Sequence, residues 1–239
     1  MVGFSEDGTK LIILSNITPP LKLGMPEEYQ YNWLNKVGEN QLLANVFEEA
    51  KKQDFGSLNK SNGNEAFRKA CNDGQSEMAE VLLNNSATLD ININAKDNNG
   101  MTGFLLASYG GHLDVVTLFM KNLTPTKINL NAKDNNGRTA FSWACQGGHS
   151  DVVKHLMENS ATMNIDLNAK SDNGNTAFHR ACSKGRTNIV EMMLNQADAL
   201  QLDLTSKGKH GRTGFQWAQS YGKTAVVKII KAKRPSIAV

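Results

Sequence analysis

The sequence predicts an all-α repeat solenoid with β-hairpin loops, and three residue types that recur in register carry this prediction. Glycine returns every 37 residues, at Gly63, Gly100, Gly137, Gly174 and Gly211. Phenylalanine and alanine keep the same step, at Phe67, Phe104, Phe141, Phe178 and Phe215 and at Ala70, Ala107, Ala144, Ala181 and Ala218. A fixed period of roughly 20–50 residues without insertions indicates stacked units and not a single globular core. About six such units fit the chain, and we expect one cooperative domain.

Each unit begins with a tight turn and a short helix. In the copy that starts at Gly137, the segment Asp134-Asn135-Asn136-Gly137 suits a type I turn, because glycine takes a positive φ without a Cβ clash. Thr139 follows where its hydroxyl can cap the first free amides of a helix over about 139–146. Gly147-Gly148 then ends this helix.

A second helix and an extended return complete the unit. Ser150 opens the second helix, whose apolar face recurs at helical spacing: Val152, Val153, Leu156 and Met157. After it, Met163, Ile165 and Leu167 alternate with polar residues, which is the period of an extended strand. One unit cannot bury both of these faces, so each is stable only against its neighbours.

Several of these segments resemble the ankyrin repeat. Gly174–Cys182 (GNTAFHRAC) is similar to its turn and TPLHxA helix, Gly148–Val153 (GHSDVV) to its second helix, and Leu167-Asn168-Ala169 to its hairpin return. The likeness spans roughly residues 27–233 and implies an ankyrin repeat array of five clear repeats plus a degenerate N-terminal capping repeat. The period of 37 exceeds the usual value of about 33. The excess lies in the segment Ser-Ala-Thr before the Ile or Leu pair, so we expect longer finger loops.

The chain divides accordingly. Residues 1–26 match no repeat and are expected to form an N-terminal arm, extended or partly disordered; the alternative is a segment that lies in the binding groove or docks a partner. Residues 27–62 are expected to form the degenerate N-terminal cap, with Tyr31 on the Phe67 register. The further repeats are expected at 63–99, 100–136, 137–173 and 174–210, and the C-terminal capping repeat at 211–239.

Composition and charge predict the cellular compartment of the chain. The net charge is +3, three cysteines form an odd set, and Lys10–Leu14 is too short an apolar run for a membrane span or a secretory signal. We therefore expect a monomeric intracellular protein of the cytoplasm, with the nucleus left open, and no membrane insertion. From Thr205 onward the chain carries eight basic residues and no acidic one. This excess is either solubilising charge on the cap or a docking end for an acidic partner; no nucleic-acid reader motif accompanies it.

The cysteines and histidines predict packing groups. Cys71, Cys145 and Cys182 share one repeat position on the buried side of the first helix, without the spacing of a zinc site. His112 and His149 are expected to bond local backbone, and His179 to bond within its turn. Gly222-Lys223-Thr224 lacks the earlier glycine and the preceding strand of a phosphate loop. We expect no cofactor, no metal and no catalytic activity.

One feature is not explained by the repeat. Trp33, Trp143 and Trp217 occupy a single repeat position, at which the other copies carry Lys69, Leu106 and Arg180. The position lies two residues after the buried Phe, about 200° around the helix, and so faces away from it. The row is either packing between successive inner helices or a set of aromatic and cationic anchors for a partner.

The resemblance implies binding of a protein partner, of unknown identity, through the hairpin fingertips and the concave face of the inner helices. The fingertip residues are then Asn98, Asn99, Met101, Asn135, Asn136, Arg138, Asp172, Asn173, Asn175, Lys209, His210 and Arg212. The inner-helix residues are Tyr109, Trp143, Gln146, Arg180, Ser183, Lys184, Trp217 and Tyr221. The predicted function is a non-catalytic protein–protein interaction module. The alternatives are the ankyrin portion of a larger enzyme or channel, and an effector or inhibitor that blocks a target enzyme.

Overall fold

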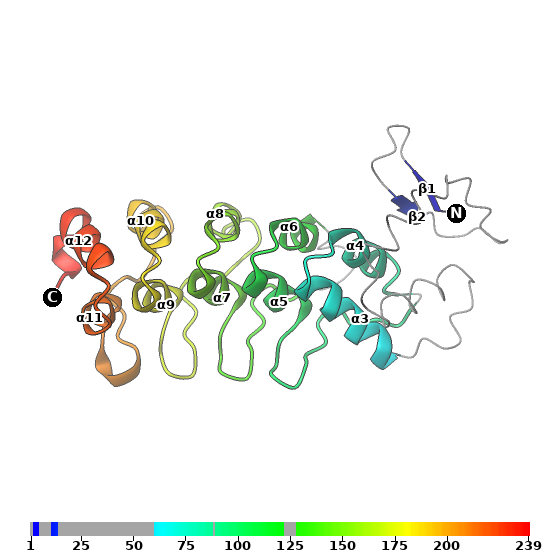
Figure 1. Ribbon diagram of the computed structural model, residues 1–239, viewed down its shortest axis with the longest axis horizontal. Coiled ribbons are helices and arrows are strands. Elements are labelled where there is room, and N and C mark those ends of the chain that lie inside the picture. Colours follow the sequence, from blue (N-terminus) through cyan, green and yellow to red (C-terminus); the bar gives the residue numbers. More distant parts are fainter. Residues whose placement is uncertain (1, 5–10, 14–59, 88, 122–127) are drawn as a thin grey trace.

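The computed structural model describes residues 2–4, 11–13, 60–87, 89–121 and 128–239, and in this part of the chain it is a stack of helix pairs (Figure 1). The inner helices are α3 (Lys60–Asn72), α5 (Gly103–Gly110), α7 (Ala140–Gly147), α9 (Ala177–Lys184) and α11 (Gly214–Ser220). The outer helices are α4 (Ser76–Asn84), α6 (Leu113–Lys121), α8 (Ser150–Glu158), α10 (Thr187–Gln196) and α12 (Thr224–Lys233). Each row packs along the array, and the long turns project beside the inner row. Short 3-10 segments cover Lys209–Gly211 (η2) and Pro235–Ile237 (η3).

Within the expected N-terminal arm, the structure describes one antiparallel strand pair. Strand β1 (Val2–Phe4) pairs with β2 (Leu11–Ile13), with Gly3 opposite Ile12. The expected capping repeat at 27–62, including Tyr31 and Trp33, lies outside the described residues except for its last three positions, which open α3.

The predicted helix caps are confirmed. The hydroxyls of Thr102, Thr139 and Thr213 accept hydrogen bonds from the backbone amides three residues later, at 3.3–3.4 Å. Thr176 and His179 form a reciprocal capping box, in which Nδ1 of His179 accepts from the Thr176 amide, and Thr213 and Gln216 form another. These contacts satisfy amides that a helix start leaves without partners, so each inner helix begins at a fixed residue.

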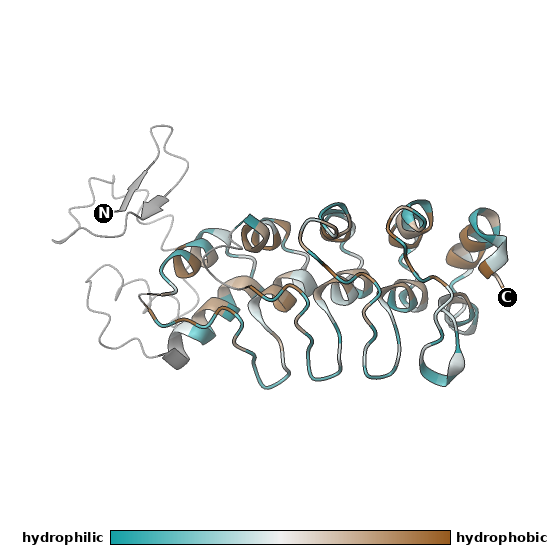
Figure 2. Ribbon diagram, turned by 180° about the vertical axis from the view of Figure 1, so that it is seen from behind, coloured by the Kyte–Doolittle hydropathy of each residue, from teal (hydrophilic) through white to brown (hydrophobic). Residues whose placement is uncertain are grey.

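The buried face is the one that the period predicts. All five Phe and all five Ala of the register are buried, and hydrophobic stretches run between the two rows while the turn tips are hydrophilic (Figure 2). Phe119 contacts Phe67 and Phe104 edge-on, with ring centroids 5.6 and 5.4 Å away, which joins two units through one aromatic group. Cys71, Cys145 and Cys182 are buried free thiols, and burial raises the pKa of each well above its usual value.

Two predictions about the turns are wrong. Gly63 lies inside α3 and not in a turn, because this copy has Lys60 and Glu65 where the other copies have a turn residue and a capping Thr. The extra residues do not lengthen the finger loops either. They add a turn to the end of the outer helix, where the Met163 amide donates to the Asn159 carbonyl at 2.9 Å.

The extra turn ends on a left-handed residue and supports a ladder of asparagines. Asn164 has φ of 50° and Gln201 of 51° at the same repeat position. From the preceding unit, the Asn131 side chain donates to the Asn164 carbonyl (2.7 Å) and accepts from the Asp166 amide (2.9 Å). Asn168 repeats both bonds with Gln201 and Asp203. The return segments, which form no strand in the described residues after 60, are thus joined by side chains.

Candidate partner-binding face

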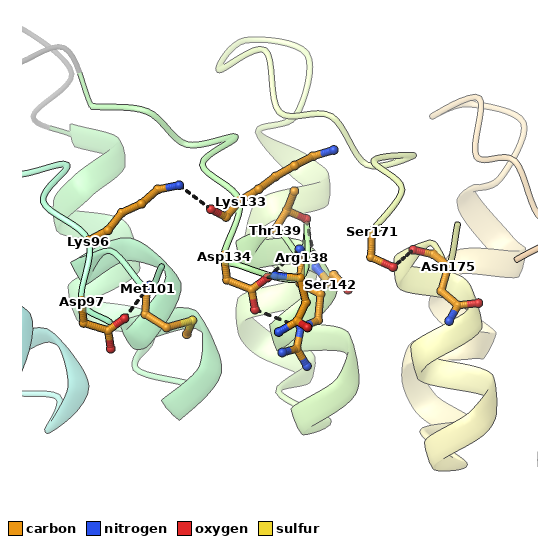
Figure 3. A network of polar contacts seen from close by, with 11 residues as sticks. Lys96, Asp97, Met101, Lys133, Asp134, Arg138, Thr139, Ser142, Ser171 and Asn175 are labelled. Atoms are coloured by element: carbon orange, nitrogen blue, oxygen red, sulfur yellow. Dashed lines mark hydrogen bonds and ion pairs between the residues drawn. The ribbon is translucent and has the colours of Figure 1, made fainter. Parts of the chain in front are cut away.

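The turns between units are held by a side chain at their first position. Oδ1 of Asp97 accepts from the amides of Asn99 and Met101, both at 2.8 Å. Asp134 repeats this pair of bonds with Asn136 and Arg138 at 2.8 and 2.9 Å (Figure 3). A carboxylate that accepts two amides closes the turn on itself, so the tip has one conformation without help from a partner.

Successive tips are also joined laterally. The Asn135 amide donates to the Asn99 carbonyl, and the Asp172 amide to the Asn136 carbonyl, each at 3.0 Å. Nζ of Lys96 donates to the Lys133 carbonyl at 2.8 Å (Figure 3), and Nζ of Lys133 donates to the Lys170 carbonyl of the next unit at 3.0 Å. The tips therefore form a fixed line along the array and are not independent loops.

The first aromatic cluster lies where α5 and α7 meet. The Trp143 ring contacts Tyr109 edge-on at 4.9 Å between centroids, and the guanidinium of Arg138 lies over the same ring at 4.0 Å. Nε of Arg138 also donates to Oδ2 of the buried Asp134 at 2.9 Å. This arginine is therefore fixed by an ion pair and a cation–π contact together.

A second cluster repeats the arrangement on α11, two units further along. The guanidinium of Arg212 lies 5.2 Å from the centre of the Trp217 ring. Tyr221 stacks on this same Trp217 ring, with 5.3 Å between the centroids and 12° between the planes. His210 lies 6.4 Å from the Trp217 ring. Position 208, the counterpart of Asp134, is a glycine, so this arginine lacks the carboxylate that its counterpart has.

Arg180 occupies the Trp position of α9, between the two clusters. It is half-buried, and its Nε is shielded from solvent without a hydrogen-bond partner. Burial lowers the pKa of Arg180, and the positive charge of Arg138 lowers it further. The indole N–H groups of Trp143 and Trp217 are likewise without acceptors. Three buried donors of this row therefore have no acceptor among the described residues.

A family model of ankyrin repeats in three copies matches four overlapping stretches of the chain, residues 36–129, 70–171, 119–203 and 163–238. Together these matches extend over most of the sequence. The chain belongs to the ankyrin repeat family. The first match begins at residue 36, within the segment that is expected to form the N-terminal cap. No individual curated protein matches the chain.

Ankyrin repeats are in general protein–protein interaction modules, and the family is typically non-catalytic. No group of three or more His, Cys, Asp or Glu side chains in the described parts of this ankyrin chain is placed to hold a metal ion. None of its described helices is both long and apolar enough to cross a membrane.

The expected binding residues of the ankyrin chain fall into three groups by burial. Twelve are exposed: Asn98, Asn99, Tyr109, Asn135, Asn136, Asp172, Asn173, Lys184, Lys209, His210, Arg212 and Tyr221. Six are half-buried on the same side: Arg138, Trp143, Gln146, Arg180, Ser183 and Trp217. We call the surface formed by these two groups the inner face.

The prediction of a binding role is wrong for two residues, because both are buried. Met101 is 7% exposed and Asn175 is 8% exposed. The Met101 amide closes the Asp97 turn, and the Asn175 side chain accepts from the Lys209 amide at 3.2 Å. Both residues hold turns, and neither side chain reaches the surface.

The histidine prediction also needs correction. Nε2 of His149 bonds the Tyr109 carbonyl at 2.7 Å, and His112 bonds the Asn72 carbonyl at 2.8 Å. These acceptors belong to the preceding unit and not to the local backbone. Nε of Arg186 replaces the imidazole in the next copy and donates to the Gln146 carbonyl at 3.0 Å. His179 does bond within its turn as expected, and it also bonds the Arg212 carbonyl at 3.1 Å.

Sequence reasoning missed the carboxylate clamps and the Arg-over-Trp pairs. A signal for both was present. Asp occurs at the first turn position in two copies, and the Asp side chain is one that commonly bonds the backbone two residues later. Arg precedes Trp by five residues in the same two copies that carry a described Trp, at Arg138 and Arg212.

Proposed function

We propose that this ankyrin chain is a non-catalytic interaction module whose protein partner binds the inner face. One observation carries the proposal. Among the described residues, the large apolar side chains that remain exposed are Tyr109 (49%), Tyr221 (56%) and Val239 (79%), and both tyrosines belong to the aromatic clusters of this face. Large aromatic rings that a fold leaves exposed beside arginines are the residue types enriched in binding hot spots.

The geometry of the tips supports the same proposal. Each tip is closed by its own hydrogen bonds and joined to its neighbours, so a partner would meet a surface that is already ordered. Binding to such a surface costs little conformational entropy, since few loops have to be ordered on contact. The partner's orientation would be set by the exposed Asn side chains of the tips, and most of the affinity would come from the aromatic clusters.

The basic C-terminal end is a weaker candidate for the partner site. Arg234 makes a bidentate ion pair with Asp198, at 2.7 and 3.1 Å. Lys233 contacts Glu191 at 3.1 Å and Asn195 at 2.9 Å. Two of the basic residues of this end therefore already have acidic or polar partners in the preceding unit. A position within a larger enzyme, or an inhibitory role, would use the inner face in the same way.

The test is affinity capture from a lysate of the source cells, read out by mass spectrometry. The variant Arg212→Ala/Tyr221→Ala removes exposed side chains of the terminal part of the inner face. The matched control Lys154→Ala/Lys228→Ala removes exposed side chains of the outer helices. We expect loss of the captured partner only with the first variant, with both melting temperatures close to that of the wild type. A partner retained by the first variant and lost by the control would move the site to the outer helices.

A further inference from the structure

We propose, building on the inner face as the partner site, that the partner contributes an extended acidic segment. In this arrangement its carboxylates pair with Arg180 and Arg212. Two bulky apolar side chains of the same segment lie against the two aromatic clusters, one beside Trp143 and the other beside Trp217.

The charge of the inner face points to an anion. Its cationic groups are Arg138, Arg180, Lys184, Lys209 and Arg212, against one acidic group, Asp172. Of the five, Arg138 has a carboxylate partner, the buried Asp134. No ion pair to a described residue holds Arg180 or Arg212. A half-buried guanidinium with a buried Nε and no acceptor is costly, and a carboxylate that reaches it would supply the missing charge and acceptor together.

The two clusters set the length of the segment. Trp143 and Trp217 are two repeats apart, with α9 between their helices. Packed helices lie roughly 8–10 Å apart, so the clusters are separated by about 16–20 Å. An extended chain rises about 3.3 Å per residue, so this distance corresponds to about five or six residues. The segment should carry its bulky side chains at that spacing, with acidic residues between them, opposite Arg180.

The same geometry disfavours a single-stranded nucleic acid. Such strands bind by stacking bases on open aromatic rings. The Trp217 ring already has Tyr221 stacked on it and Arg212 over it, and the Trp143 ring has Arg138 over it. A guanidinium that stacks on a ring keeps its edge N–H groups available in its own plane, where a carboxylate can accept two of them.

The first experiment selects peptides from a random display library of about 12 residues, which is long enough to span both clusters. The whole chain serves as bait. We expect selected peptides to be enriched in Asp and Glu and to carry two bulky apolar residues about five or six positions apart. Selection of neutral or basic peptides, or of none, would overturn the proposal. The lysate capture tests the inner face independently, so the acidic inference can fail while the site stands.

The second experiment measures the Kd of one selected peptide by fluorescence anisotropy. Arg180→Gln should weaken binding about tenfold, because it removes the positive charge and keeps a polar side chain that can donate hydrogen bonds. Lys228→Gln on the outer helix α12 is the matched control and should change the Kd by less than about twofold. A peptide in which every Asp and Glu is replaced by Asn and Gln should lose binding to the wild type. Equal effects of the two variants would contradict the assignment. Tight binding of an oligonucleotide of about 12 nucleotides with the same Arg180 dependence would favour nucleic acid instead.

Discussion

The two Arg-over-Trp clusters share an arginine and a tryptophan at the same repeat positions, yet they differ in how the fold holds them. In the interior cluster, Arg138 is paired with Asp134, and Trp143 contacts Tyr109 of the preceding unit. In the terminal cluster, Gly208 replaces the aspartate, Arg212 lies further from its ring, and Trp217 stacks on Tyr221 of its own unit.

This difference indicates a division of roles along one surface. The interior cluster joins two units, so its contacts contribute to folding as well as to the surface. The ring contacts among Arg212, Trp217 and Tyr221 lie within one unit, so removing them should affect binding more than folding. We therefore expect packing to dominate at Trp143 and anchoring to dominate at Trp217. Each of the following measurements compares the two clusters or their surroundings.

The largest effect is expected in the core beneath the clusters. Phe141→Ala should lower the free energy of unfolding by about 3–5 kcal/mol, because the ring is fully buried between two neighbouring units. Phe215→Ala, in the unit of the terminal cluster, should cost about 2 kcal/mol less. Urea denaturation followed by circular dichroism measures both. Equal shifts of the midpoint would contradict stabilisation by nearest-neighbour contacts.

The second largest effect is expected on replacing the two described tryptophans. Trp143→Ala should cost about 3 kcal/mol of folding stability, since its half-buried ring contacts the preceding unit. Trp217→Ala should cost about 1 kcal/mol in stability and about 2 kcal/mol or more in partner binding. Stability is read from urea midpoints and binding from titration with a captured partner or selected peptide. If Trp217→Ala proves the more destabilising of the two, the assigned roles are reversed.

The turn carboxylate is expected to have a smaller effect. Asp134→Ala removes the acceptor of two amides and of Nε of Arg138, and should cost about 2 kcal/mol. Asp134→Asn keeps one acceptor oxygen for the turn and should cost about 1 kcal/mol, which isolates the ion pair. Arg212→Ala, in the cluster without a turn carboxylate, should cost about 0.5 kcal/mol or less. A loss at Arg212 as large as that at Asp134 would mean that the terminal arginine also holds the fold.

The smallest effect is a pH dependence at His179, whose Nε2 bonds the Arg212 carbonyl of the terminal turn. Burial lowers the pKa of His179 below its usual value of 6.5, despite the bonds to that carbonyl and to Ser206. The unfolded chain therefore binds a proton that the folded chain does not. Neutral His179 therefore contributes to the free energy of unfolding above about pH 6.5. This contribution is lost as the pH falls toward the lower pKa that His179 has in the folded state.

The measurement is the urea midpoint at two pH values, about one unit above and one unit below 6.5. The wild type should lose stability between them, and His179→Asn, which keeps an acceptor for the Thr176 amide, should lose less. An unchanged pH dependence in the variant would show that other groups titrate in this range.

Much of this architecture follows from the sequence because its causes are local and repeated. The buried Phe and Ala positions, the thiols and the Thr caps depend on residues within one unit, and the fixed period copies them. The failure at Gly63 has a local cause too: an Asn-Gly pair predicts a turn, but without an aspartate before it and a capping threonine after it, the helix continues through it.

The contacts between units were not predictable in the same way. Asn131 bonds backbone groups 33 and 35 residues later, and His149 bonds a carbonyl 40 residues earlier. No pattern within a single unit specifies such partners, because they depend on how far each unit is rotated and shifted against the next. The division of the inner face into a fixed and an open cluster depends on the same geometry.

The asparagine ladder has a consequence for how a further return segment could be added to the array. Asn131 and Asn168 each present an amide edge that binds the return segment of the following unit. At the next repeat position stands Thr205, and its hydroxyl donates to Oδ1 of Asp203 in its own segment at 3.0 Å. Thr205 has no amide edge, so a return segment placed after it would lack the pair of bonds that Asn131 and Asn168 supply.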